Sequence, residues 1–379
     1  MSKLKNLLVK RTEEERDLAG KLAEAIGCNR SVIAKFKNPE KELDSFDSLI
    51  AIVKLLDEDN ELELMVDYAE SLDVNNKTAR YMLEYLVVSR QMEAMRRLLN
   101  RMKEAKNKDS IEWASFYELL YTQLTDYRNV DYKQRLVTTT NYRTNTLEMR
   151  VMRKLLNVYS HYETEGYKNM LDIIEVIEGV LTEIKDGFIR KSYQARALEM
   201  KIYVCLTVND NREEARKLSR ELINLNVSKK YTAYAYHTIG LSYLYESYDE
   251  GIKHLNRSIS IYEEVDSPTS KSDIAQVEDT KELFAAVWNK KIDYKIEMYY
   301  KLYIAYQGEK VDSVSTIHDV AFKLLIEGIQ DQSLNLLMNS LIEFVKRGDK
   351  FQANLTKIAL NRLGYNHDFI TNLININNW

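Results

Sequence analysis

The sequence contains very few of the residues that interrupt helices. Proline occurs only twice, at Pro39 and Pro268, and glycine occurs eleven times in 379 residues. A β-rich fold of this length needs many turns, and turns favour these two residue types. Good helix formers such as Leu, Glu, Lys, Arg and Ala are abundant instead. The composition therefore predicts an all-α fold.

Cysteine and long apolar runs are also scarce. Cys28 and Cys205 lie far apart in the sequence, so they indicate neither a disulfide framework nor a metal cage and are typical of a reduced cytosol. No apolar run is long enough to span a bilayer. Residues 1–11 alternate Lys with Leu and lack the apolar stretch of a secretion signal. We expect a cytoplasmic protein with no membrane partner.

Motifs of catalysis and of cofactor binding are absent. The sequence has no Gly-rich phosphate loop and no nucleophile elbow, and its five histidines lack metal-ligand spacing. His161 lies near Glu163 and Glu165, but the end of a surface helix is the simpler interpretation. We expect no enzyme activity, no catalytic residue, no cofactor and no metal.

The first 60 residues have a helical pattern with clear breaks. Residues 12–26 predict a helix, with Thr12 as its N-cap and Glu15 as its capping-box partner. Gly27 can end this helix, because glycine adopts the left-handed conformation easily. A short helix to residue 37, a turn at Pro39 and a helix capped by Ser45 follow.

The segment 21–39 resembles the helix-turn-helix of phage-repressor-type DNA-binding domains. Residues 28–38 contain three cations and no acid, and the second helix of this motif enters the major groove. We therefore predict a DNA-binding domain over residues 1–60. Its candidate base contacts are Asn29 and Arg30, and its candidate phosphate contacts are Ser31, Lys35 and Lys37.

A helical cap without a role in DNA binding is the alternative for this segment. Residues 1–60 contain eleven cations and twelve anions, so the domain as a whole is not basic. A second basic stretch, from Arg90 to Lys108, would add phosphate contacts or form a solvated helix face.

The rest of the chain shows a helical pattern interrupted by polar joints. Residues 233–243 and 247–259 match the two helices of a tetratricopeptide unit, with small residues at Gly240 and Gly251. Small side chains let paired helices approach closely, and stacked pairs bury a common core. We predict a tetratricopeptide-like α-solenoid over residues 61–365 and a C-terminal capping or dimerisation helix over residues 366–379.

Stacked helical hairpins form a concave groove that suits an extended peptide. Tyr203, Lys230 and Tyr234 lie in or near the best repeat. Lys230 can hold a terminal carboxylate and the Tyr rings can pack against side chains, so we predict that they bind a peptide. The alternative is that these Tyr side chains fill helix seams.

Four further blocks are not generic repeat residues: 72–85, 186–198, 233–240 and 346–351. They resemble the arbitrium peptide receptors of Bacillus phages, within the RRNPP group of peptide-sensing regulators. The resemblance implies a homodimer in the cytoplasm of the bacterial host that binds operator DNA and activates a gene favouring lysis. A short signalling peptide would stop that activation and favour lysogeny.

The resemblance also implies roles for single residues. Lys230 matches a family arginine that grips the peptide, and Asp349 and Phe351 match groove residues. Asp349 would pair with a basic peptide side chain. Tyr203 and Leu241 depart from the asparagines that the family pattern has in the groove.

Three other functions fit parts of this pattern. One is a quorum-sensing regulator of a different operon, and another is a helical-repeat protein that acts as a response-regulator phosphatase or sequesters a protein partner under peptide control. The phosphatase class has a helical bundle in place of the helix-turn-helix, which the turn at Gly27 argues against. The third is a structural scaffold, which would need no DNA-reading head.

Overall fold

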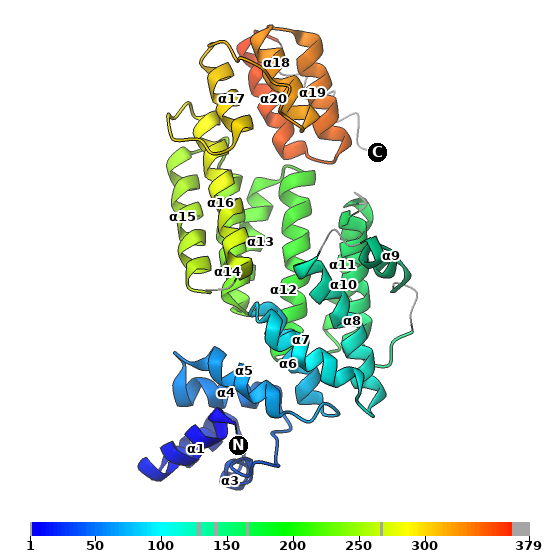
Figure 1. Ribbon diagram of the computed structural model, residues 1–379, viewed down its shortest axis with the longest axis vertical. Coiled ribbons are helices and arrows are strands. Elements are labelled where there is room, and N and C mark those ends of the chain that lie inside the picture. The colour runs from blue at the N-terminus through cyan, green and yellow to red at the C-terminus, as the bar shows by residue number, and fades with distance from the viewer. Residues whose placement is uncertain (1, 127–129, 140–142, 164–166, 266–267, 366–379) are drawn as a thin grey trace. The chain divides into compact units, whose positions relative to one another are not determined.

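The computed structural model is built from helices. It describes residues 2–126, 130–139, 143–163, 167–265 and 268–365, and these residues form twenty α-helices, one π-helical segment and no strand (Figure 1). This confirms the prediction of an all-α fold.

The chain divides into two compact units. The first comprises residues 1–160 and 173–196, and the second comprises residues 161–172 and 197–379. Helices α10 (Leu147–Glu163), α11 (Tyr167–Leu181) and α12 (Phe188–Tyr203) contribute residues to both units.

The other helices of the first unit are, in chain order, α1 (Lys3–Glu14), α2 (Leu18–Ala25), α3 (Arg30–Phe36), α4 (Phe46–Asp57), α5 (Glu61–Ser71), α6 (Lys77–Val88), α7 (Met92–Lys103), α8 (Lys108–Thr125) and α9 (Val130–Thr139). Those of the second unit are the π-helix η1 (Val204–Val208), α13 (Arg212–Leu225), α14 (Lys229–Ser242), α15 (Tyr248–Glu263), α16 (Pro268–Val287), α17 (Glu297–Tyr306), α18 (Val320–Gln330), α19 (Leu334–Lys346) and α20 (Lys350–Arg362).

Several local signals at the N-terminus are confirmed. Gly27 has a φ of 65° and lies in the turn between α2 and α3. The Ser45 hydroxyl caps α4 by accepting the backbone N–H of Ser48. The predicted short helix corresponds to α3.

The predicted N-cap at Thr12 is wrong. Residues 3–14 form helix α1, which begins after Ser2, and the Thr12 hydroxyl donates to the carbonyl of Leu8 inside this helix. Leu4 and Leu8 are four residues apart and therefore lie on one helical face, where both are fully buried. The apolar face of α1 therefore outweighs the capping-box signal.

In the second unit, successive helices from α13 to α20 pack against one another in chain order. Glycine permits the closest approaches. A Cβ at Gly251 would lie 2.1 Å from the ring of Phe284, and one at Gly240 would lie 2.8 Å from the side chain of Leu255. These distances support the reason given above for small residues in the repeat.

Two parts of the predicted organisation stay predictions. The domain boundary at residue 60 falls in the turn between α4 and α5. The predicted C-terminal helix over residues 366–379 lies outside the described residues. Among the described residues, no helix has both the length and the apolar character that a membrane crossing requires.

Candidate functional site

The candidate DNA-reading head contains two short helices, α2 and α3, joined by a glycine turn. The Cys28 N–H donates to the Ala23 carbonyl at 2.8 Å, which closes the end of α2. Arg30 begins α3, and its guanidinium donates to the Asp17 carboxylate at 2.7 Å. The same guanidinium lies over α2 at Gly20, where a Cβ would meet it at 2.2 Å. In this structure Arg30 therefore points back onto α2.

The other four predicted DNA-binding residues lie on or beside α3. Asn29 is its N-cap residue and Ser31 lies in its first turn, and both are exposed. Lys35 is exposed and Lys37 is half-buried. Within the described part of the chain, neither lysine forms an ion pair. These two cations are therefore available to an anionic partner such as a phosphate backbone.

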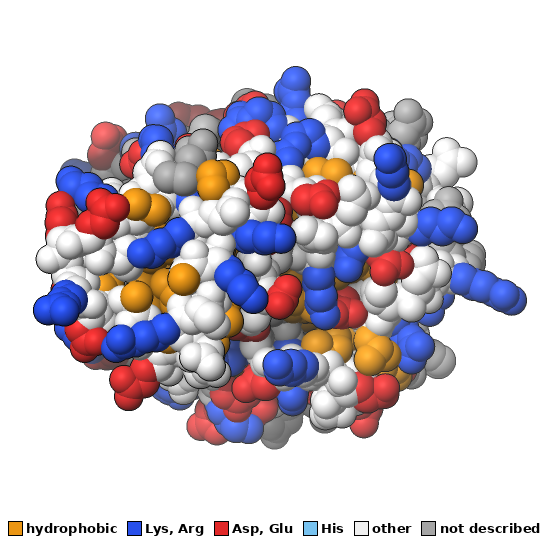
Figure 2. Space-filling view, turned by 90° about the horizontal axis from the view of Figure 1, so that it is seen from below, with side chains coloured by type: hydrophobic (Ala, Val, Ile, Leu, Met, Phe, Trp, Pro, Cys, Tyr) orange, Lys and Arg blue, Asp and Glu red, His pale blue; other side chains and the backbone are white. Residues whose placement is uncertain are grey.

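The surface near the head is mixed in sign. Figure 2 views the molecule from the side on which α1 and α3 are drawn in Figure 1, and its Lys and Arg side chains alternate with Asp and Glu. The second basic stretch lies largely on α7, where Arg97 pairs with Glu70 at 2.6 Å and Lys103 pairs with Glu118 at 2.6 Å. Those cations serve contacts within the first unit.

The predicted peptide-binding residues lie in the second unit. The Lys230 ammonium forms an ion pair with Glu199 of α12, and both side chains are largely buried. We call this pair and the predicted peptide-binding residues around it the cluster. The Tyr234 hydroxyl donates to the Glu199 carbonyl at 3.2 Å. The Lys230 ammonium also lies 5.7 Å from the centre of the Tyr234 ring. A ligand carboxylate at Lys230 would therefore compete with Glu199.

Tyr203 lies one turn further along α12 and belongs to an aromatic group. Its ring centre lies 4.9 Å from that of Tyr162 and 5.9 Å from that of Tyr167. Burial raises the pKa of Tyr203, and the nearby Asp349 carboxylate raises it further. Burial likewise raises the pKa of Tyr162, with a smaller contribution from Glu199. Tyr162 thus contacts Tyr203 and lies within electrostatic range of Glu199.

Asp349 precedes α20 and is its N-cap. Its carboxylate accepts the Gln352 N–H at 2.8 Å and lies 3.7 Å from Arg347. Burial raises its pKa to about 6, although the bond from Gln352 and the charge of Arg347 act in the opposite direction. Arg347 and Gln352 therefore offset only part of the effect of burial on this carboxylate, so a basic ligand group would further stabilise its charged form.

Phe351 is the most buried of the five predicted residues, with 2% of its surface exposed. Its ring lies 5.1 Å from that of Tyr245, whose hydroxyl donates to the Phe351 carbonyl. The Arg212 guanidinium lies 4.9 Å from the Tyr245 ring and pairs with Asp210. Phe351 therefore packs against Tyr245 beside Asp349, and its buried ring presents little surface to a ligand.

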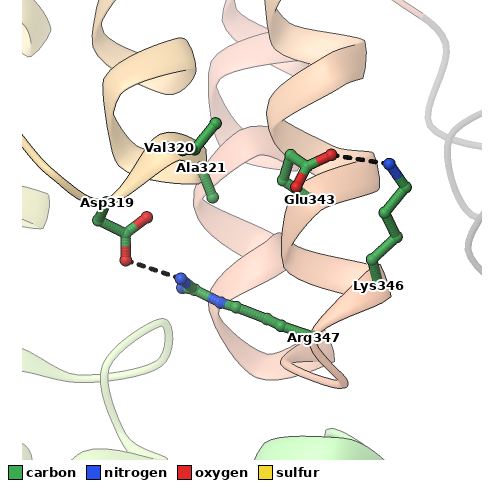
Figure 3. A pocket seen from close by; sticks show the side chains of 6 residues that line it. All are labelled: Asp319, Val320, Ala321, Glu343, Lys346 and Arg347. Atoms are coloured by element: carbon green, nitrogen blue, oxygen red, sulfur yellow. Dashed lines mark hydrogen bonds and ion pairs between the residues drawn. The ribbon is translucent and has the colours of Figure 1, made fainter.

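A pocket of about 300 Å³ lies next to this cluster (Figure 3). It is lined by Asp319, Val320, Ala321, Glu343, Lys346 and Arg347. The Arg347 guanidinium donates to Asp319 at 2.7 Å and to Gln352 at 2.8 Å, so it joins the pocket to the turn that contains Asp349. Figure 3 shows the Asp319–Arg347 and Glu343–Lys346 pairs on its walls.

The sequence alone did not identify Glu199 and Arg347 as parts of the cluster. Glu199 lies four residues before Tyr203 on the same helix, so helical spacing was a usable signal. Arg347 lies inside the block 346–351 that resembles the peptide receptors. In the described parts of the chain, no three His, Cys, Asp or Glu side chains are grouped so that they would hold a metal ion.

Comparison with known proteins places these features in a family. Residues 61–362 match the family described as "AimR transcriptional regulator-like". The AimR transcriptional regulator of Bacillus phage phi3T is 24% identical, over 96% of this chain and 98% of its own length. The AimR transcriptional regulator of Bacillus phage SPbeta is 25% identical, over 99% of this chain and 100% of its own length.

Two solved structures have the same fold. The selenomethionine form of phAimR superposes with a TM-score of 0.73 at 24% identity, covering 98% of this chain and all of that one. The phAimR–ligand structure gives a TM-score of 0.72 at 22% identity, covering 86% of this chain and all of that one. Because the family model matches most of its length, the chain belongs to the family of AimR-like transcriptional regulators, which are not enzymes.

Proposed function

We propose that this regulator binds operator DNA through α3 and that a short peptide bound in the second unit controls this binding. The observation on which the proposal rests is the cluster in the second unit. Tyr203, Lys230 and Tyr234 lie on α12 and α14, and they form one connected group with Asp349 and Phe351, which are more than a hundred residues further along the chain. Ion pairs and aromatic rings in such a group suit a peptide that has both charged and apolar parts.

The charges of the cluster suggest the orientation of the peptide. Lys230 is the cation that would receive the peptide carboxylate, with Glu199 released from its present pair. Asp349 lies near the other end and would receive a basic side chain. The two poles differ in sign, so a peptide with a free carboxylate and an arginine would bind in one direction only.

DNA binding would use the cations of α3. Lys35 and Lys37 would contact phosphates, as would the Ser31 hydroxyl. Asn29 and Arg30 would reach base edges, once Arg30 leaves Asp17. A homodimer would place two such heads on two half-sites, and a change in their spacing would alter the affinity.

The biological output would be the choice between lysis and lysogeny. In this proposal the ligand-free dimer activates a gene that favours lysis. Binding of the phage-encoded peptide releases the dimer from DNA and favours lysogeny. The names of the phage relatives, which call them transcriptional regulators, support the first half of this scheme.

A mobility shift with DNA from upstream of the gene tests the proposal. The wild-type chain should shift this DNA in preference to a scrambled fragment, and Arg30→Ala with Lys35→Ala should abolish the shift without loss of helicity. Adding the short peptide encoded beside the gene should weaken the shift. A wild-type chain that shows no sequence preference would remove the basis for DNA reading and favour action on a protein partner.

A further inference from the structure

Lys5 is a buried cation at the N-terminus that the proposed DNA contacts do not use. It lies on α1 and only 2% of its surface is exposed. Its ammonium donates to the carbonyls of Asn38 at 2.8 Å, Pro39 at 2.9 Å and Lys41 at 2.6 Å. An ammonium has three N–H donors, so these bonds use its full capacity.

The three carbonyls belong to the loop that follows α3. This helix ends at Phe36, and the Asn38 N–H still donates to the Lys35 carbonyl at 3.0 Å. Helix ends leave carbonyls without intrahelical partners, and a cation at a helix C-terminus is favourable. Lys5 therefore supplies donors to the loop just beyond α3, where the Asn38 carbonyl also accepts the Lys41 N–H.

Two buried aromatic rings lie beside the ammonium group of Lys5. Its ammonium lies 5.2 Å from the ring centre of Phe36 and 6.0 Å from that of Tyr68, and both rings are buried. Burial lowers the pKa of Lys5, and the charge of Glu42 opposes this only in part. In the described part of the chain no carboxylate forms an ion pair with Lys5, so the three loop carbonyls are the groups that stabilise its positive charge.

Helix α3 needs such a contact because it has only seven residues. A helix of this length is not stable alone and takes its orientation from its neighbours. Its first residue is tied to α2 through Arg30 and Asp17, and the loop that follows its last residue is tied to α1 through Lys5. Reading of base edges tolerates errors of only about 0.5 Å.

We propose that Lys5 is a positioning residue for DNA recognition: it holds the loop 38–41 against α1 and thereby sets the orientation of α3, without touching DNA. This inference rests on the proposed DNA binding by α3. It concerns a side chain that is buried and therefore out of reach of a phosphate.

The test uses Lys5→Met in the full-length protein, because Met keeps the apolar stem and removes the three donors. The matched control is Lys10→Met on the same helix, where the lysine is 72% exposed. Leu8→Ala, which removes a fully buried side chain one turn away, serves as a variant that destabilises the head without changing the loop bonds.

The probe is DNA that the wild-type protein enriches from a random-sequence library, with unselected DNA for comparison. Binding is measured by fluorescence anisotropy at several salt concentrations, at temperatures where circular dichroism shows each variant to be folded. Lys5→Met should weaken binding to the selected DNA by at least about tenfold. The slope of log affinity against log salt should stay unchanged, whereas loss of a phosphate contact would lower it by about 0.9.

Each other outcome has a defined meaning. If Lys5→Met binds the selected DNA as Lys10→Met does, or loses affinity only in proportion to its loss of thermal stability as Leu8→Ala does, Lys5 does not position α3. A lowered salt slope would make Lys5 a phosphate contact and would also overturn the inference. If the wild-type protein enriches no sequence at all, the proposed DNA reading itself fails, which is a separate result.

Discussion

Breaking the buried ion pair between Glu84 and Arg196 should strongly destabilise the first unit. Glu84 is fully buried and Arg196 is 6% exposed. The guanidinium donates to both Glu84 oxygens, at 2.9 Å from Nε and 3.0 Å from Nη2. The Tyr117 hydroxyl donates to Glu84 at 2.7 Å, and the Ser192 hydroxyl donates to the same carboxylate. Helices α6, α8 and α12 thus meet at one charged group.

The size of the effect follows from the burial of both charges. Removing one partner leaves the other charge buried without compensation, which costs about 3–5 kcal/mol. We therefore expect Arg196→Met to lower the free energy of unfolding of this unit by that amount. Replacing both residues by Met removes both charges. The remaining cost comes from hydroxyls, such as that of Tyr117, that lose their acceptor, so the free energy of unfolding falls by only about 1–3 kcal/mol.

Urea unfolding followed by tryptophan fluorescence measures these energies. Trp113 is a buried reporter in the first unit, and replacing Trp288 and Trp379 by Phe removes the other signals. The control is Arg97→Met, which breaks an exposed pair with Glu70 and should cost less than about 1 kcal/mol. The reasoning fails if Arg196→Met costs no more than this control, or if the double variant is less stable than both single variants.

Three further predictions concern the charges of the two candidate sites. Because the pKa of Asp349 is about 6, its charged form is lost as pH falls, so an arginine-containing peptide should bind about tenfold more weakly at pH 5 than at pH 7.5. Calorimetric titration of Asp349→Asn, which keeps the N-cap acceptor, should show no such dependence, and equal pH profiles would contradict the assignment. Glu199→Gln releases Lys230 from its ion pair and should strengthen binding of a peptide with a free carboxylate, whereas amidation of that carboxylate should remove the gain. Asp17→Asn frees Arg30 and removes a negative charge beside α3, so affinity for operator DNA should rise most at low salt; unchanged affinity would mean that Asp17 does not compete with DNA.

Local signals in the sequence predicted the elements that depend on near neighbours. The turn at Gly27, the cap at Ser45 and the short helix α3 are examples, because each is set within a few residues. The small residue at Gly251 was also predictable, since the repeat pattern specifies close packing at this position. These features need no knowledge of the distant chain.

Long-range partners were the features that the sequence did not predict. Lys5 and the loop after α3 are more than thirty residues apart, and nothing local marks that contact. The pairing of Lys230 with Glu199 depends on how α12 and α14 pack, so the sequence showed a lysine available to a ligand where the structure shows an ion pair. Helix α1 was not predicted for the same reason, because its apolar face is buried only by helices that come later in the chain.

We propose that a peptide bound at Asp349 changes the affinity for DNA, and one titration tests this most directly. Fluorescence anisotropy would follow DNA that the wild-type chain selects, with and without a short peptide that contains an arginine and a free carboxylate, for the wild type, Lys35→Ala and Asp349→Asn. We expect the peptide to weaken wild-type binding, Lys35→Ala to bind weakly in both conditions, and Asp349→Asn to bind DNA normally but to need a higher peptide concentration for release than the wild type. DNA affinity that is the same with and without a peptide that demonstrably binds the chain would contradict this account.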